Sequence, residues 1–212
     1  MNQILTEYYP LILSTEQLNE AVETIPGAPM HIKKVLLQKA DAENRNKRIY
    51  PRSILEREVK NYDENFVKTR RALGELDHFE NPTINLKNVS HIITEIWWEG
   101  NDVYGNVEIL DGPEFPAGRI AAGLLRRKIP IGISSRALGS VTKTNEGVNM
   151  VNDDLQLSCW DLVSYESTIG SNFNLNEGHN PQIINLHNNR IDSIIHEIIC
   201  NNTNYCPCKF DK

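Results

Sequence analysis

A short apolar run that ends in two serines and an arginine, IGISSR at residues 131–136, restricts the possible folds more than any other part of the sequence. Aliphatic residues flank Gly132, a pattern typical of a buried strand in which the missing side chain lets another part of the chain or a ligand approach. We expect the strand to end at Ser134-Ser135-Arg136, at the rim of a sheet or barrel. A hydroxyl on rigid backbone there suits a nucleophile, although a solvated serine pair is the commoner finding.

Hydrophobic periodicity places further elements around this run. Residues 1–30 show no sustained period and end in the breaker PGAP, so we interpret them as an extension. Past Ser171 the chain becomes polar and rich in asparagine. The expected strands are 31–39, 89–98, 103–110 and one or two within 148–163; the expected helices run from Pro51 to the Arg70 region, over 117–128 and over 191–199.

Composition argues against several functional classes. The chain has 212 residues, a formal net charge of −6 and a pI near 5.5, whereas nucleic-acid binding usually requires a basic face. No run of about 18 apolar residues is present, so we expect no membrane span. The N-terminus lacks the basic segment of a secretory signal, so we expect no such signal either. No glycine loop of the phosphate-binding kind is present, and we expect no cofactor. The length fits one domain with extensions, and the sparse cysteines favour a reducing, cytoplasmic compartment.

Hydrolysis by a serine needs a hydroxyl, an imidazole that takes its proton and a third group that orients the imidazole. Ser134 is the candidate hydroxyl. Among the six histidines, His78 ends an acidic turn beside chain breakers, and such loops host function more often than cores do. His91 lies within an apolar strand and fits a structural role better. Asp161 is a carboxylate flanked by apolar residues, so it must be paired, either with the imidazole or in a structural salt bridge.

Five segments, in one order within residues 32–172, carry a family resemblance: NRNKRIYPRSILEREV, LGELDH, VSHIITEIWWEGNDVYGNVEIL, GISSRALGSV and LQLSCWDLVSYEST. The chain resembles the prohead core proteases of T-even-type tailed phages, relatives of the herpesvirus assembly protease. The resemblance implies an α+β fold with a closed, mainly antiparallel β-barrel flanked by helices. Together with the composition of the two ends, it divides the chain into an N-terminal extension or propeptide (1–30), a serine protease domain (31–172) and a polar tail with an amphipathic helix (173–212).

The same resemblance implies a viral serine endopeptidase that digests the internal scaffold and trims capsid proteins during prohead maturation. Position by position, His78 matches the family's catalytic histidine, Ser134 its nucleophile and Asp161 its acidic third member. The proline that often follows the histidine is Phe79 here, which bears on how the substrate fits.

Hydrolysis of a peptide bond also needs donors placed in advance for the developing oxyanion. The candidates are backbone N–H groups near Ala137 and Gly139, or the Arg136 guanidinium, for which a structural ion pair is the alternative role. Ala137 replaces a glycine that often follows the SSR motif in the family, a second departure that concerns the fit of the substrate.

Proteases of this family are similar in cutting after glutamate in a Leu/Ile-x-Glu pattern. The pattern occurs in the terminal extensions at Glu20, Glu177 and Glu197, and it predicts self-processing there. It also occurs at Glu75 and Glu95 in the expected core, which shows how readily it arises by chance.

The resemblance implies scaffold or core proteins and the major capsid protein as partners, inside the viral prohead in the host cytoplasm, and we also expect a homo-oligomer. Neither nucleic acid nor a membrane is an expected partner. Two alternatives stay open: a catalytically inactive core or scaffold component of the immature capsid, and a hydrolase of another ester or amide. A zinc site in the tail is a further option but not the expectation, because the Cys-x-Cys spacing is unusually tight; its ligands would be His196, Cys200, Cys206 and Cys208.

Overall fold

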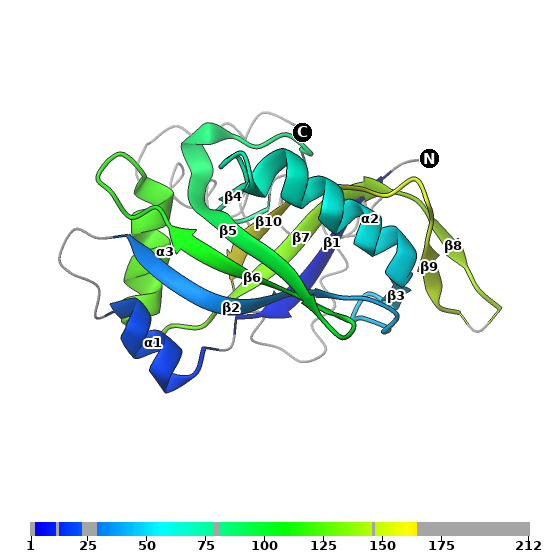
Figure 1. Cartoon of the computed structure of the whole chain (residues 1–212), viewed down its shortest axis with the longest axis horizontal. Coiled ribbons are helices and arrows are strands. Elements are labelled where there is room, and N and C mark those ends of the chain that lie inside the picture. Colours follow the sequence, from blue (N-terminus) through cyan, green and yellow to red (C-terminus); the bar gives the residue numbers. More distant parts are fainter. Residues whose placement is uncertain (1–2, 12, 23–28, 79–80, 146, 165–212) are drawn as a thin grey trace, which may run out of the picture. The chain divides into compact units, whose positions relative to one another are not determined.

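Strands dominate the computed structural model, which describes residues 3–11, 13–22, 29–78, 81–145 and 147–164 (Figure 1). All of these residues belong to the unit Met1–Ser167, and their strands form three sheets. The first has the order β1-β7-β10, made of Gln3–Pro10, Ile131–Gly139 and Gln156–Ser164. The second has the order β2-β6-β5-β4, made of Met30–Lys39, Asp102–Ile109, Val89–Glu99 and Leu73–Glu75. The third is small and has the order β3-β9-β8, made of Arg48–Ile49, Asn149–Val151 and Val141–Lys143.

Pairing is antiparallel throughout the two larger sheets, so the predicted α+β class with mainly antiparallel sheets is confirmed. An isolated bridge between Leu76 and Leu162 joins these sheets. Among the described residues the pairing therefore gives separate sheets and no closed barrel, unlike the barrel that the resemblance implies. The sheets do not close at either pair of edges: β4 has only three residues and pairs with β10 only through the bridge at Leu76 directly after it, and among the described residues no ladder joins β1 to β2.

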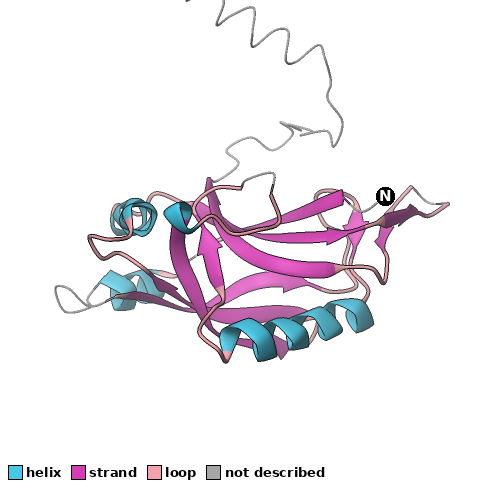
Figure 2. Cartoon of the chain, turned by 90° about the horizontal axis from the view of Figure 1, so that it is seen from above, coloured by secondary structure: helices cyan, strands magenta, loops and turns pink. Residues whose placement is uncertain are grey.

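Helices lie outside the strands rather than among them (Figures 1 and 2). They are α1 (Thr15–Val22), α2 (Arg52–Tyr62) and α3 (Pro116–Arg126), with a π-helical turn at Asp63–Val67 and a 3-10 turn at Leu86–Asn88. α2 packs on β10: the Leu157 N–H donates to Glu58 Oε2 at 3.0 Å, and the Tyr62 ring meets Trp160 edge-on at 5.0 Å between centroids. Within the described ranges no helix combines the length and apolar character that crossing a membrane requires.

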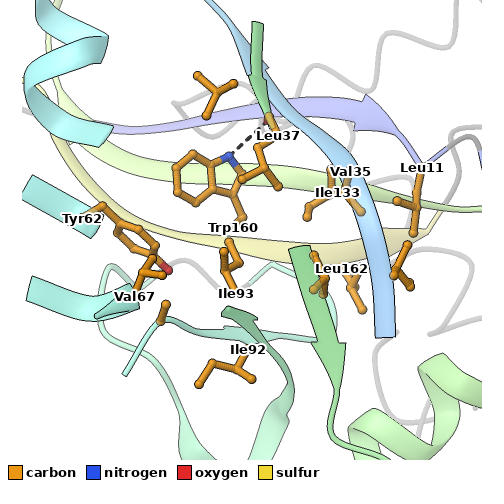
Figure 3. Packing of buried hydrophobic residues seen from close by; sticks show 14 of the residues in the cluster. Leu11, Val35, Leu37, Tyr62, Val67, Ile92, Ile93, Ile133, Trp160 and Leu162 are labelled. Carbon is orange, nitrogen blue, oxygen red and sulfur yellow. Dashed lines mark hydrogen bonds between the residues drawn. The ribbon is translucent and has the colours of Figure 1, made fainter. Parts of the chain in front are cut away.

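The hydrophobic core lies between the two larger sheets and is centred on Trp160 (Figure 3). This fully buried indole donates its N–H to the Leu37 carbonyl at 3.1 Å and thereby links β10 to β2. Ile93 from β5 and Ile133 from β7 belong to the same cluster. Buried aromatic side chains of this size dominate core energetics, so the strands on both sides of Ser134 and Asp161 are held firmly.

Most predicted elements lie within a few residues of their expected positions, including the strands at 31–39, 89–98 and 103–110. The N-terminus differs, because the supposed extension contains β1 and α1. β1 lacks a readable alternation since the side chains that it buries are Leu5 and Glu7, one apolar and one acidic. The tail from 165 onward, with the helix expected at 191–199, lies outside the described residues.

Candidate active site

Ser134 lies on β7, the central strand of its sheet, where only 2% of the residue is exposed. The prediction that the strand ends at Ser134-Ser135-Arg136 is wrong, because β1 and β10 pair with β7 as far as Gly139 or Leu138. Asp161 is the direct cross-strand partner of Ser134 on β10. Since directly opposed residues of an antiparallel pair share a face, the hydroxyl and the carboxylate lie side by side.

His78 reaches this face from the loop that follows β4. The Asp77 N–H donates to the Leu162 carbonyl at 2.8 Å, and Asp77 adopts φ +66°, a left-handed conformation that aspartate tolerates better than most residues. The turn directs His78 to the two strands: its Nε2 lies 2.6 Å from Ser134 Oγ, and its Nδ1 lies 2.9 Å from Asp161 Oδ2. A carboxylate only accepts, so Nδ1 carries the proton and Nε2 accepts from the hydroxyl.

Asp161 is fully buried and is held from several sides. The Glu75 backbone N–H donates to its Oδ1 at 2.9 Å, and Arg136 Nη2 donates to the same oxygen at 3.3 Å. Arg136 Nε lies 3.1 Å from Oδ2 in an ion pair. Burial raises the pKa of Asp161, but the hydrogen bonds from His78 and Glu75 and the charge of Arg136 outweigh it and lower the pKa below its ordinary value of 3.8. Asp161 is therefore a carboxylate at neutral pH and can hold an imidazolium beside it.

The predicted site residues Ser134, His78 and Asp161 are thus brought together. The candidate oxyanion donors are not suitably placed. Arg136 has a fully buried side chain whose guanidinium contacts Asp161, Glu75, Cys159 and the Asn81 carbonyl. Ala137 and Gly139 lie three and five positions beyond Ser134 on the same strand, which at about 3.3 Å per residue puts them about 10 and 17 Å away. A donor must lie within about 3 Å of the oxyanion, so these positions are a poor fit.

The other described histidines have different surroundings. His91 is fully buried, and its Nε2 lies 3.1 Å from the Trp160 carbonyl while its Nδ1 lies 2.9 Å from Ser90 Oγ. Burial lowers the pKa of His91 to about 4, so it is neutral, and its role is structural as the sequence indicated. His31 is exposed on β2. His179, His187 and His196 lie outside the described residues.

The self-cleavage candidates are only partly described. Glu20 lies in α1, where its side chain is 65% exposed, and Ala21 after it is buried. Glu177 and Glu197 lie outside the described residues, as do the cysteines considered for zinc. Within the part of the chain that the structure describes, no group of three or more histidine, cysteine, aspartate or glutamate side chains is arranged to hold a metal ion.

Two neighbours of the site, Glu75 and Tyr8, were not singled out from the sequence, although Glu75 lies in the LGELDH segment. Glu75 is fully buried, and it contacts Asp161 and Arg136. Tyr8, in the supposed extension, is the cross-strand partner of Ser134 on β1, and its ring covers Gly132. The close approach that Gly132 permits is therefore made by Tyr8: a Cβ at position 132 would lie 2.0 Å from the ring.

Comparisons with known proteins point to one family. Residues 10–170 match the family model described as prohead core protein serine protease. The prohead core protein protease of Enterobacteria phage T4 is 43% identical over 133 residues, which is 63% of this chain and 61% of that protein. The solved structure of the bacteriophage T4 capsid assembly protease is similar with a TM-score of 0.66 and 35% identity, over 77% of this chain and 98% of that one. The sequence match thus spans about three fifths of the length of the phage T4 relative.

Proposed function

Because the chain belongs to the prohead core protein serine protease family, we propose that it is an endopeptidase that cleaves internal scaffold and capsid proteins during prohead maturation. The observation that carries the proposal is the continuous hydrogen-bonded series from Ser134 through His78 to Asp161, with distances of 2.6 and 2.9 Å. This is the arrangement that activates a serine hydroxyl, which alone is almost fully protonated at neutral pH.

In the proposed mechanism Ser134 Oγ attacks the scissile carbonyl carbon while His78 Nε2 takes the hydroxyl proton. His78 then donates this proton to the leaving amine, and the acyl group remains on Ser134. Water hydrolyses the ester in the second half of the reaction, with His78 again acting as base and then returning a proton to Ser134. Asp161 keeps the proton on Nδ1 in the resting enzyme and stabilises the imidazolium that forms.

The proposal includes cleavage after glutamate in a Leu/Ile-x-Glu pattern. The wild-type chain should cut a Leu-x-Glu peptide faster than the matched Leu-x-Gln peptide, and equal rates for the two peptides would contradict this preference.

Self-processing after Glu20 is part of the proposal. The bond lies within the last turns of α1, so that turn must open before the chain can enter an active site. β1 pairs with β7 at eight register positions, which gives the severed segment reason to stay bound. N-terminal sequencing of the active enzyme should find Ala21, and an intact Met1 terminus as the sole sequence would contradict self-processing.

The direct test is incubation of the purified chain with a Leu-x-Glu peptide beside the Ser134→Ala variant. Cleavage after glutamate by the wild-type chain alone is expected. Equal cleavage by both proteins, or none by either, would refute the enzymatic proposal and leave the inactive core or scaffold component as the better description. The natural partners, scaffold proteins and the major capsid protein in the prohead, can then be tested as substrates in the same assay.

A further inference from the structure

Arg136 and Glu75 form an ion pair with both side chains fully buried beside Asp161. Arg136 lies two positions after Ser134 on β7, so its side chain is on the same face of the sheet as Ser134. Its cross-strand partner on β10 is Cys159. Its guanidinium meets the Asp161 carboxylate with two nitrogens, at 3.1 and 3.3 Å, in the planar fork that favours bidentate pairing. Arg136 therefore fixes the orientation of the Asp161 carboxylate as well as its charge.

Glu75 completes this arrangement from β4. Its backbone N–H donates to Asp161 Oδ1 at 2.9 Å, while its side-chain Oε2 pairs with Arg136 Nη2. Removing either side chain of the ion pair would leave a buried charge without its partner, which is strongly unfavourable. An acidic residue is therefore needed at position 75 to balance the buried charge of Arg136.

The same pair holds the loop that carries His78. Beyond His78, the Asn81 carbonyl accepts from Arg136 Nη1, and the Asn85 N–H donates to Glu75 Oε1 at 2.8 Å. One ion pair consequently contacts Asp161 on β10 and two backbone positions of the His78 loop. It connects the three chain segments that supply the proposed catalytic residues.

The charge balance around His78 and Asp161 follows from the buried groups that the structure describes. Among the titratable groups near Asp161, burial raises the pKa of the Cys159 thiol and of Tyr62 and lowers that of His91, so these groups are neutral at pH 7. Among the described residues, the charged side chains buried around Asp161 are then Arg136 and Glu75, while Asp77, which precedes His78, is exposed to solvent. The carboxylates of Asp161 and Glu75 and the guanidinium of Arg136 together carry one net negative charge. A second proton on the His78 imidazole neutralises this charge.

From this geometry we propose that the Arg136–Glu75 ion pair is a positioning element of the protease, fixing Asp161 against His78 and holding the His78 loop in register with Ser134. This inference rests on the proposed function. Neither side chain needs to touch the substrate, so the effect should fall on kcat and on the pH dependence rather than on KM.

The test compares Glu75→Gln with Glu7→Gln as a matched control. Glu7 is also a buried acid with an arginine partner, 3.1 Å from Arg48, but it lies opposite Ser135, on the face away from Ser134. Both variants lose a buried ion pair and should lose stability. Only Glu75→Gln should lower kcat, by about 10²-fold with KM within twofold, because small displacements of catalytic groups cost about that much.

The pH profile separates positioning from stability. Glu75→Gln removes a negative charge near His78, so the imidazolium is less favoured and the acid limb of kcat/KM should move to lower pH by about 0.5–1 unit. Glu75→Asp keeps the charge and should restore the position of the limb. An unmoved limb and an unchanged kcat in Glu75→Gln, or equal changes in Glu7→Gln, would overturn the proposal.

A second measurement does not depend on cleavage. The proton on His78 Nδ1, identified in the NMR spectrum with a His78→Gln variant, should shift or exchange faster in Glu75→Gln and stay unchanged in Glu7→Gln. If the wild-type chain cuts no peptide, the proposed function fails while this comparison still decides the positioning role. An identical Nδ1 proton signal in wild type and Glu75→Gln would overturn it. If Glu75→Gln does not fold, Arg136→Lys, which keeps the charge but loses the planar fork, is the test variant, and the same identical signal would overturn the proposal.

Discussion

Replacing Gly132 by alanine should destabilise the protein, because the Tyr8 ring occupies the space beside Gly132. A Cβ at this position would lie 2.0 Å from Tyr8 Cε2 and 2.6 Å from Cζ. Carbon atoms in contact are normally about 3.5–4.0 Å apart, so the ring must move by about 1.5–2 Å or the strands must separate. Overpacking of this kind costs about 1–3 kcal/mol, and relief of the glycine backbone entropy returns about 0.5–1 kcal/mol. The expected net loss of unfolding free energy lies within about 0–2.5 kcal/mol, with a central value of about 1 kcal/mol.

Urea unfolding of wild type, Gly132→Ala, Tyr8→Ala and the double variant measures this loss by linear extrapolation. Tyr8→Ala vacates the space that the new methyl group needs, so the double variant should be no less stable than Tyr8→Ala alone. The two substitutions should therefore be non-additive by about the cost of Gly132→Ala. Additive losses would refute the reasoning, since they would mean that the Tyr8 ring does not cover Gly132 and that β1 does not pack beside the nucleophile strand as described.

Three further outcomes follow from the site and its surroundings. Asp161→Asn should lower kcat by about 10⁴-fold in the peptide assay while leaving KM nearly unchanged, because an amide no longer favours the productive tautomer; a loss below tenfold would contradict the role of Asp161. His91 binds a proton below pH 6.5 in the unfolded chain but only near pH 4 in the folded one, so stability falls on acidification across this interval. His91→Gln should therefore reduce the loss of unfolding free energy between pH 7 and pH 4.5 by about 2.5 kcal/mol, and an unchanged pH dependence would speak against a buried neutral His91. Gly74→Ala should destabilise more than Gly132→Ala in the same urea experiment, because its Cβ would lie 2.2 Å from the Trp160 backbone carbonyl, which cannot rotate away as a side chain can.

Patterns confined to short segments predicted most of the strands and helices. The β5–β6 hairpin is an example, since its β-branched and aromatic strands and the turn at Gly100 can be read within one stretch of sequence. β1 was not predicted because it buries Glu7, whose carboxylate accepts hydrogen bonds from Arg48 and from the Tyr50 hydroxyl, the latter at 2.8 Å. A buried acid breaks the alternation on which strand prediction depends.

The residue types needed for serine hydrolysis, and the family to which they belong, were determined by the sequence alone: the motifs around His78, Ser134 and Asp161 are local and specific in their order. Only the tertiary structure decided that Tyr8 lies beside Ser134, that Arg136 is turned toward Asp161 and Glu75, and that the strand continues past the serines. These facts depend on the register between strands far apart in the chain, and a shift of one residue would reverse the face of every side chain. Register is set by which buried groups pair across the core, and no single segment contains that information.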